Sequence, residues 1–162
     1  MNKRIEFVIG FTLVVLSVTS FVAVAQSADP WVGTWKVNLE KSTYSPGPKP
    51  TTAATVKMES WQGGLKVTID GANAQGQPTH TEAMGKFDGK DNPVSGAAAP
   101  NTTTAYKRID ARTFEALGKV DGKPGLTTRV VVSADGKTLT ATQTGTDPQG
   151  QAVKNVIVAD KQ

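Results

Sequence analysis

The stretch Leu65-Lys66-Val67-Thr68-Ile69-Asp70 alternates apolar and polar residues at every position. Successive side chains of a strand point to opposite faces of a sheet, so this period of two indicates a half-buried β-strand. Similar alternation recurs in both directions along the chain, and almost nothing after residue 30 has helical periodicity. We expect strands near residues 31–38, 53–61, 64–70, 79–87, 102–109, 112–119, 125–133, 137–144 and 153–159, with a short one around 91–95.

Tight-turn dipeptides separate several of these segments. Asp88-Gly89, Asp121-Gly122 and Asp135-Gly136 are each followed by lysine, and Asp-Gly is favoured in hairpin turns because both residues tolerate a positive φ. Short strands at near-regular spacing predict an all-β fold, an antiparallel up-and-down meander of about eight to ten strands. We expect this meander to close as a barrel, with a β-sandwich as the alternative.

The alternation also assigns the side chains to an inner and an outer face. The many threonines are good strand residues and poor core residues, so we expect them on the outer wall. The apolar positions are expected to point inward: Trp35, Val37, Val56, Met58, Leu65, Val67, Ile69, Phe87, Tyr106, Phe114, Val130, Val132 and Leu139.

Five small residues share the inward positions: Ala83, Gly85, Ala116, Gly118 and Ala141. An eight-stranded barrel is just wide enough to be filled by side chains or to hold one small ligand. Small inward residues therefore favour a cavity, but glycines and alanines also let a sheet bend and coil. The sequence favours neither interpretation over the other.

Two irregular segments interrupt the strands. Residues 42–52 contain Pro46, Pro48 and Pro50, which have no backbone N–H to donate, so we expect an extended crossover that covers one end of the barrel. Residues 91–101 are expected to form a loop, either a lid beside an opening or an ordinary surface connection.

A faint internal similarity links residues 68–77 to residues 142–151. Both segments leave a strand through a glycine and end in Gln-Gly-Gln. Shared turn chemistry explains this similarity, so we expect two hairpins with similar long turns.

The amino-terminal residues have the pattern of a secretory signal peptide. Lys3 and Arg4 precede an apolar run over residues 7–18, and Ala23-Val24-Ala25 fits the small-residue cleavage pattern. We expect cleavage near Ala25–Gln26, which gives a signal peptide over residues 1–25 and one barrel domain over residues 26–162. The expected location is periplasmic or secreted, without stable membrane insertion, and an uncleaved anchor is the alternative.

Composition excludes several classes of protein. The chain has no cysteine, so neither a lipid-anchored lipoprotein nor a disulfide framework is expected. The net charge of +4 is spread over alternating signs, as at Lys57 and Glu59, rather than gathered in a basic patch. Nucleic-acid surfaces cluster Lys and Arg, so no nucleic-acid partner is expected. The oligomeric state is not indicated.

No catalytic constellation stands out. The single histidine, His80, lies on the polar side of its strand beside Glu82, where an exposed position is expected rather than a general base. One histidine without cysteine is a poor ligand set for zinc. The glutamates lie on no visibly apolar face that would raise a carboxyl pKa. We therefore expect no enzyme, no catalytic residue, no metal site and no cofactor.

Several motifs resemble one group of small exported bacterial proteins described as lipocalin-like. Gly33-Thr34-Trp35 matches the Gly-x-Trp signature with which lipocalin barrels begin, and Ala159 stands where this resemblance leads us to expect an aromatic. The resemblance implies an up-and-down barrel and assigns no catalytic residue. The other similar stretches are Ser45-Pro46-Gly47-Pro48, Asp88-Gly89-Lys90-Asp91-Asn92-Pro93-Val94, Lys107-Arg108-Ile109-Asp110, residues 133–140 and residues 155–162.

The expected function is binding of a small apolar or amphipathic molecule inside the barrel. The alternative is a structural or interaction module of the cell envelope whose barrel is filled. Arg108, which shares the inward parity of Tyr106, is expected either to meet an anionic ligand group or to stack on Trp35 and seal the base, as an arginine does in lipocalins. The expected ligand contacts are Trp35, Met58, Val67, Phe87, Tyr106, Arg108, Phe114 and Val130.

Overall fold

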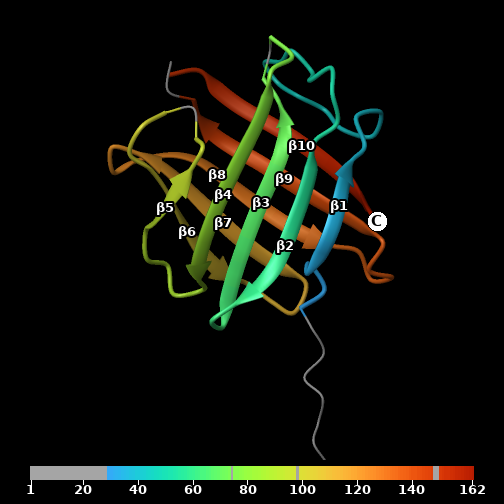
Figure 1. The fold of residues 1–162 in the computed structure, drawn as a ribbon, viewed down its shortest axis with the longest axis vertical. Coiled ribbons are helices and arrows are strands. Elements are labelled where there is room, and N and C mark those ends of the chain that lie inside the picture. Colours follow the sequence, from blue (N-terminus) through green and yellow to red (C-terminus); the bar gives the residue numbers. More distant parts are fainter. Residues whose placement is uncertain (1–28, 74, 98, 148–149) are drawn as a thin grey trace, which may run out of the picture.

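The described part of the chain forms one closed antiparallel β-barrel (Figure 1). The computed structural model describes residues 29–73, 75–97, 99–147 and 150–162, so the predicted signal peptide lies outside the described residues. The strands, in chain order, are β1 (Gly33–Val37), β2 (Thr55–Trp61), β3 (Gly64–Ala72), β4 (Pro78–Lys86), β5 (Asn92–Ser95), β6 (Thr102–Arg108), β7 (Thr113–Val120), β8 (Lys123–Val132), β9 (Thr138–Thr146) and β10 (Ala152–Lys161).

Closure of the barrel depends on the first strand. Each strand from β2 to β10 pairs with its neighbours in sequence, and β1 pairs with both β2 and β10. Trp35 thus lies opposite Val56 on one side and Lys161 on the other. The predicted meander and its closure are confirmed, and the sandwich alternative is excluded by this pairing.

Strand parity places the predicted inner residues inside the barrel. Nine of them belong to the buried core, and Val56, Val67 and Phe87 pack against that core. Ile69 also points inward, yet it is 40% exposed. The inner residues in the core are Trp35, Val37, Met58, Leu65, Tyr106, Phe114, Val130, Val132 and Leu139.

The two irregular segments lie on the barrel in different ways. Residues 42–52 begin along β10, where Thr43 forms an isolated bridge with Val156 and the carbonyl oxygen of Ser45 accepts a hydrogen bond from the N–H of Lys154 at 2.9 Å. Residues 91–101 contain the predicted short strand, β5, which pairs through only two residues with each of β4 and β6. This stretch is therefore the most weakly paired part of the wall.

The similar segments at residues 68–77 and 142–151 do form matching turns. The N–H of Asn73 donates to the carbonyl oxygen of Gln77 at 2.9 Å, and Asp147 makes the same bond to Gln151 at 2.9 Å. In each turn the first residue's side chain accepts a hydrogen bond from the backbone N–H of that glutamine. The prediction of two similar hairpins is confirmed.

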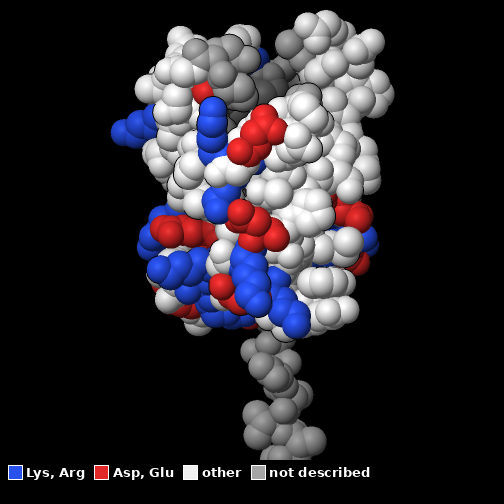
Figure 2. Space-filling view, turned by 90° about the vertical axis from the view of Figure 1, so that its left-hand side faces the viewer, with Lys and Arg blue, Asp and Glu red and all other residues white. Residues whose placement is uncertain are grey.

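The charged side chains on the face shown in Figure 2 gather in the lower half of the molecule, with both signs intermixed. The partly exposed ion pairs of the wall include Lys66–Glu82 at 2.7 Å and Arg129–Glu115 at 2.7 Å. Pairs of this kind contribute little to stability because water screens them. Within the described ranges, no helix is long and apolar enough to cross a membrane.

Candidate functional site: the barrel cavity

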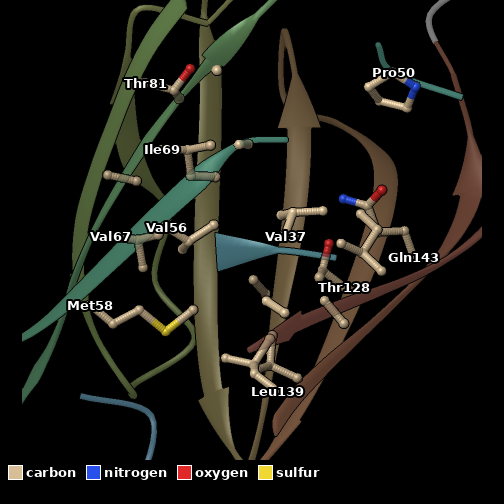
Figure 3. Close-up of a pocket in the computed structure, with 18 of the residues that line it drawn as sticks. Val37, Pro50, Val56, Met58, Val67, Ile69, Thr81, Thr128, Leu139 and Gln143 are labelled. Carbon is tan, nitrogen blue, oxygen red and sulfur yellow. The ribbon is translucent and has the colours of Figure 1, made fainter. Parts of the chain in front are cut away.

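The barrel encloses a cavity of about 480 Å³ (Figure 3). This volume falls within the range of small-molecule sites, about 300–1,000 Å³. Val56, Met58 and Val67 form one wall, and Thr128 and Leu139 form part of the opposite wall. Most of the lining is apolar, so the interior suits a molecule that is itself largely apolar.

The cavity opens at the upper end of the barrel in Figure 1. Gly71 and Thr79, at the β3–β4 hairpin, and Pro50, in the proline-rich segment, line this end. Ile69, two residues before Gly71 in β3, also lines the cavity, and its 40% exposure shows that solvent reaches the interior here. Residues 42–52 therefore border the opening at one end of the barrel, whereas the crossover was expected to cover that end.

An aromatic floor closes the opposite end. It consists of Trp31, Phe87, Tyr106 and Phe114, whose ring centroids lie 5.2–6.4 Å apart in edge-to-face contacts. Edge-to-face packing is favourable because the positive ring edge meets the negative face of its neighbour. Trp31 and Phe114 are almost completely buried. The floor therefore separates the cavity from solvent below it.

Arg108 lies beneath the aromatic floor and does not line the cavity. Its guanidinium carbon is 4.8 Å from the ring centroid of Trp31 and 4.7 Å from that of Phe87. Two of its nitrogens each donate to a carboxylate oxygen of Asp29 at 2.7 Å. This bidentate pairing with Asp29 raises the pKa of Arg108 further above its usual range. The placement fits the sealing role rather than contact with an anionic ligand.

The prediction that Arg108 stacks on Trp35 is wrong. The cation over the Trp35 ring is Lys161, with its Nζ 5.0 Å from the centroid, because β10 pairs with β1 at this position. The indole Nε1–H of Trp35 donates to the carbonyl oxygen of Trp31 at 2.8 Å. Trp31 was expected within the strand at residues 31–38 but precedes β1, and its ring is the one that Arg108 covers.

Small residues contribute to the cavity in two different ways. Ala83, Ala116 and Ala141 line it, and so does Ala159, at the position where an aromatic was expected. Gly85 instead allows close packing, because a Cβ at Gly85 would lie 2.5 Å from the amide nitrogen of Asn92. The alanines therefore leave volume for a ligand, whereas Gly85 permits a close approach within the wall.

The lining offers hydrogen-bonding groups without formal charge. Among the lining residues that the structure describes, none is Asp, Glu, Lys, Arg or His. A bound carboxylate or ammonium group would therefore lose hydration without gaining a countercharge, which is costly. The polar lining residues are Tyr44, Thr52, Thr79, Thr81, Thr104, Tyr106, Thr128 and Gln143.

The phenol of Tyr106 is held neutral at the base of the cavity. Burial raises the pKa of Tyr106 from its ordinary value of 10.0 to about 12, and a hydrogen bond with the Thr104 side chain opposes part of this increase. Desolvation has this effect because the phenolate loses more hydration energy than the neutral phenol. Tyr106 is therefore a neutral hydrogen-bonding group at any physiological pH.

This pKa predicts a loss of stability in alkali that depends on Tyr106. Between pH 10 and pH 12 the unfolded chain releases the Tyr106 proton while the folded chain retains it, so the free energy of unfolding falls as the pH rises. The contribution is complete below pH 10 and lost as the pH rises through about 12, and its size is about 2–3 kcal/mol. Denaturant unfolding from pH 9 to pH 12 should show this decline, and Tyr106→Phe should remove it.

The matched control is Tyr44→Phe at the open end. Burial also raises the pKa of Tyr44, but Tyr44 is more exposed than Tyr106, so most of the decline should persist in Tyr44→Phe. An equal decline in Tyr106→Phe and the unmodified protein would contradict the assignment to Tyr106.

The eight predicted ligand contacts divide into two groups. Met58, Val67, Tyr106, Phe114 and Val130 line the cavity. Trp35, Phe87 and Arg108 do not line it and belong to the packed base below. Strand parity alone does not distinguish these groups, because it gives the direction of a side chain and not its height along the barrel.

Tyr106 is the single polar lining residue among the predicted contacts, and the expectation that the threonines form the outer wall is wrong for Thr81 and Thr104, which line the cavity. The prediction also missed Thr128 and Gln143. Both follow from parity, because Thr128 shares the face of Val130 and Gln143 shares the face of Ala141. Both are polar, so a pattern that places apolar residues inside does not indicate them. Tyr44 and Pro50 also line the cavity, and no strand pattern in residues 42–52 indicates this.

The remaining candidate groups lie away from the cavity. The Nδ1 of His80 is 2.6 Å from Asp70 on the exposed outer face, consistent with its predicted side of β4. In the described ranges, no group of three or more His, Asp or Glu residues is placed to hold a metal ion. The absence of catalytic activity stays a prediction.

No model of a known protein family matches the sequence, and no curated protein matches it. The resemblance to the lipocalin-like group therefore stays a prediction. What is established is a closed antiparallel β-barrel with an apolar cavity that opens at one end.

Proposed function

We propose that this protein binds a small, largely apolar molecule inside its barrel. The observation that carries this proposal is the cavity of about 480 Å³, closed below by the aromatic floor and open near Ile69. A protein interior is normally close-packed, and an apolar void loses the contacts that would fill it. An apolar ligand that moves from water into the cavity would restore those contacts.

The cavity also weighs against the alternative of a filled barrel that serves only as a structural module. That alternative requires side chains to occupy the interior, but Ala83, Ala116, Ala141 and Ala159 leave it open. The signal-peptide pattern of residues 1–25 supports a role outside the cytoplasm. We therefore propose an exported carrier or binding protein rather than an envelope scaffold.

A fluorescent apolar probe tests this proposal. N-phenyl-1-naphthylamine, which fluoresces strongly only in apolar surroundings, should bind at about one molecule per chain. We expect a dissociation constant in the micromolar range, which corresponds to a binding free energy of about −8 kcal/mol. Native mass spectrometry of protein purified from its own host should also show a retained small molecule. Absence of saturable probe binding together with absence of a retained mass would overturn the proposal.

A further inference from the structure

A chain of hydrogen bonds orients one polar side chain of the cavity, Gln143. On the inner face of the wall, Gln143 of β9 lies directly opposite Thr128 of β8 and Asn155 of β10. Gln143 lines the cavity, whereas Asn155 does not. The side chain that faces the interior is therefore positioned by a neighbour outside the lining.

The polarity of Asn155 is fixed by the backbone of the proline-rich segment. Its Oδ1 accepts a hydrogen bond from the N–H of Ser45 at 3.1 Å, and only the amide oxygen can accept this bond. Ser45 is itself held by the bond from the Lys154 N–H to its carbonyl oxygen at 2.9 Å. The Asn155 amide nitrogen must then point the other way, toward Gln143.

This arrangement also fixes the polarity of Gln143. The Nδ2 of Asn155 donates to the Oε1 of Gln143 at 3.1 Å. The oxygen of Gln143 is thus directed at the wall, and Figure 3 shows its amide nitrogen pointing into the space between the two walls. The interior is therefore offered an N–H donor from Gln143, while the carbonyl oxygen of Gln143 accepts from Asn155.

We propose that the polar group of the ligand is a neutral hydrogen-bond acceptor, a carbonyl oxygen, bound by the Nε2 of Gln143. Asn155 is the positioning residue that keeps this donor facing the cavity. The uncharged lining excludes a carboxylate, which would be desolvated without a cation nearby. The inference rests on the proposed function, because it specifies the chemistry of a molecule bound in the same cavity.

Three probes with the same twelve-carbon skeleton test the acceptor: hexylbenzene, hexanophenone and 6-phenylhexanoate. Each competes with N-phenyl-1-naphthylamine for the purified protein. Hexanophenone should bind about tenfold more tightly than hexylbenzene, because only the ketone satisfies the Gln143 donor. The carboxylate should bind at least tenfold more weakly than the ketone. Equal binding of ketone and hydrocarbon, or tightest binding of the carboxylate, would overturn the inference.

Gln143→Met tests the donor itself, because methionine has a similar length and no N–H. The advantage of hexanophenone over hexylbenzene should disappear, while the affinity for hexylbenzene should be retained. The matched control is Gln151→Met in the exposed β9–β10 turn, which should keep the tenfold preference. A preference that survives in Gln143→Met assigns the donor elsewhere and contradicts the inference.

Asn155→Asp tests whether Asn155 orients the Gln143 amide. The measurement is a ratio of two ligand affinities, which a general structural defect would not change. A carboxylate at residue 155 cannot donate, so the Gln143 amide should turn its NH₂ toward the wall and its oxygen toward the cavity. The ratio of affinities for hexanophenone over the alcohol 1-phenylhexan-1-ol should then fall about tenfold. An unchanged ratio would show that Asn155 does not orient Gln143.

Different results would contradict the proposed function and the carbonyl inference. If neither N-phenyl-1-naphthylamine nor any of the probes binds, the proposed function is wrong. If N-phenyl-1-naphthylamine and hexylbenzene bind but the ketone has no advantage, the cavity binds apolar molecules and only the carbonyl inference is wrong.

Discussion

Ala141→Phe is expected to weaken binding of N-phenyl-1-naphthylamine at least a hundredfold while leaving the barrel folded. Ala141 lines the cavity between Val130 and Ile157 on the neighbouring strands. A phenyl ring at this position would occupy the space that the probe needs. A hundredfold loss corresponds to about 2.7 kcal/mol of binding free energy.

The same substitution should cost little stability, because the added ring enters a cavity. Overpacking a filled core costs about 1–3 kcal/mol, whereas filling an empty site often stabilises a protein. We therefore expect the free energy of unfolding of Ala141→Phe to lie within about 1 kcal/mol of that of the unmodified protein. Denaturant unfolding followed by circular dichroism measures this difference.

Thr140→Phe is the matched control, since it adds the same ring to the same strand. Thr140 is adjacent to Ala141 and points to the outer face. Its probe affinity should remain within about twofold of the unmodified protein, a change of about 0.4 kcal/mol. Equal loss of binding in both variants would place the probe outside the barrel and contradict an internal site.

The strands were predictable from sequence because period-two alternation and hairpin turns are local signals. The run from Leu65 to Asp70 alternates so regularly that its face assignment follows directly, and the inward direction of Ile69 was predicted in this way. Closure was a weaker prediction, since it depends on β1 reaching β10 across almost the whole chain. That pairing is non-local and leaves no periodic signature.

The sequence predicts which side chains point into the barrel, but it does not predict how far along the barrel axis each one lies. Parity placed both Val130 and Arg108 on the inner side, but only Val130 lines the cavity. The distinction depends on the partners at each end of the barrel, such as Asp29 for Arg108. The orientation of the Gln143 amide depends on Ser45, about a hundred residues away, and no local pattern specifies that contact.

Trp31→Ala is expected to destabilise the barrel by about 3 kcal/mol, the largest effect on stability among the variants considered. Trp31 is completely buried, packs against Phe87 and Phe114, and carries the guanidinium of Arg108 over its ring. Truncating a buried tryptophan to alanine costs about 3–5 kcal/mol through lost transfer energy and the cavity that remains. The lower end of this range applies because the indole Nε1 of Trp31 is buried without a hydrogen-bond partner, so its removal relieves a desolvation cost.

Circular dichroism should show a melting temperature roughly 10 °C lower for Trp31→Ala. The control is Trp61→Ala, at the end of β2, where the side chain is only partly buried and the expected loss is about 1 kcal/mol.

A second measurement distinguishes closure of the cavity by the aromatic floor from a general contribution of Trp31 to packing. Loss of Trp31 opens the lower end of the cavity, so N-phenyl-1-naphthylamine should dissociate faster from Trp31→Ala than from Trp61→Ala. If both variants lose equal stability and release the probe at equal rates, the aromatic floor does not close the barrel, and the cavity must be treated as a channel with two openings.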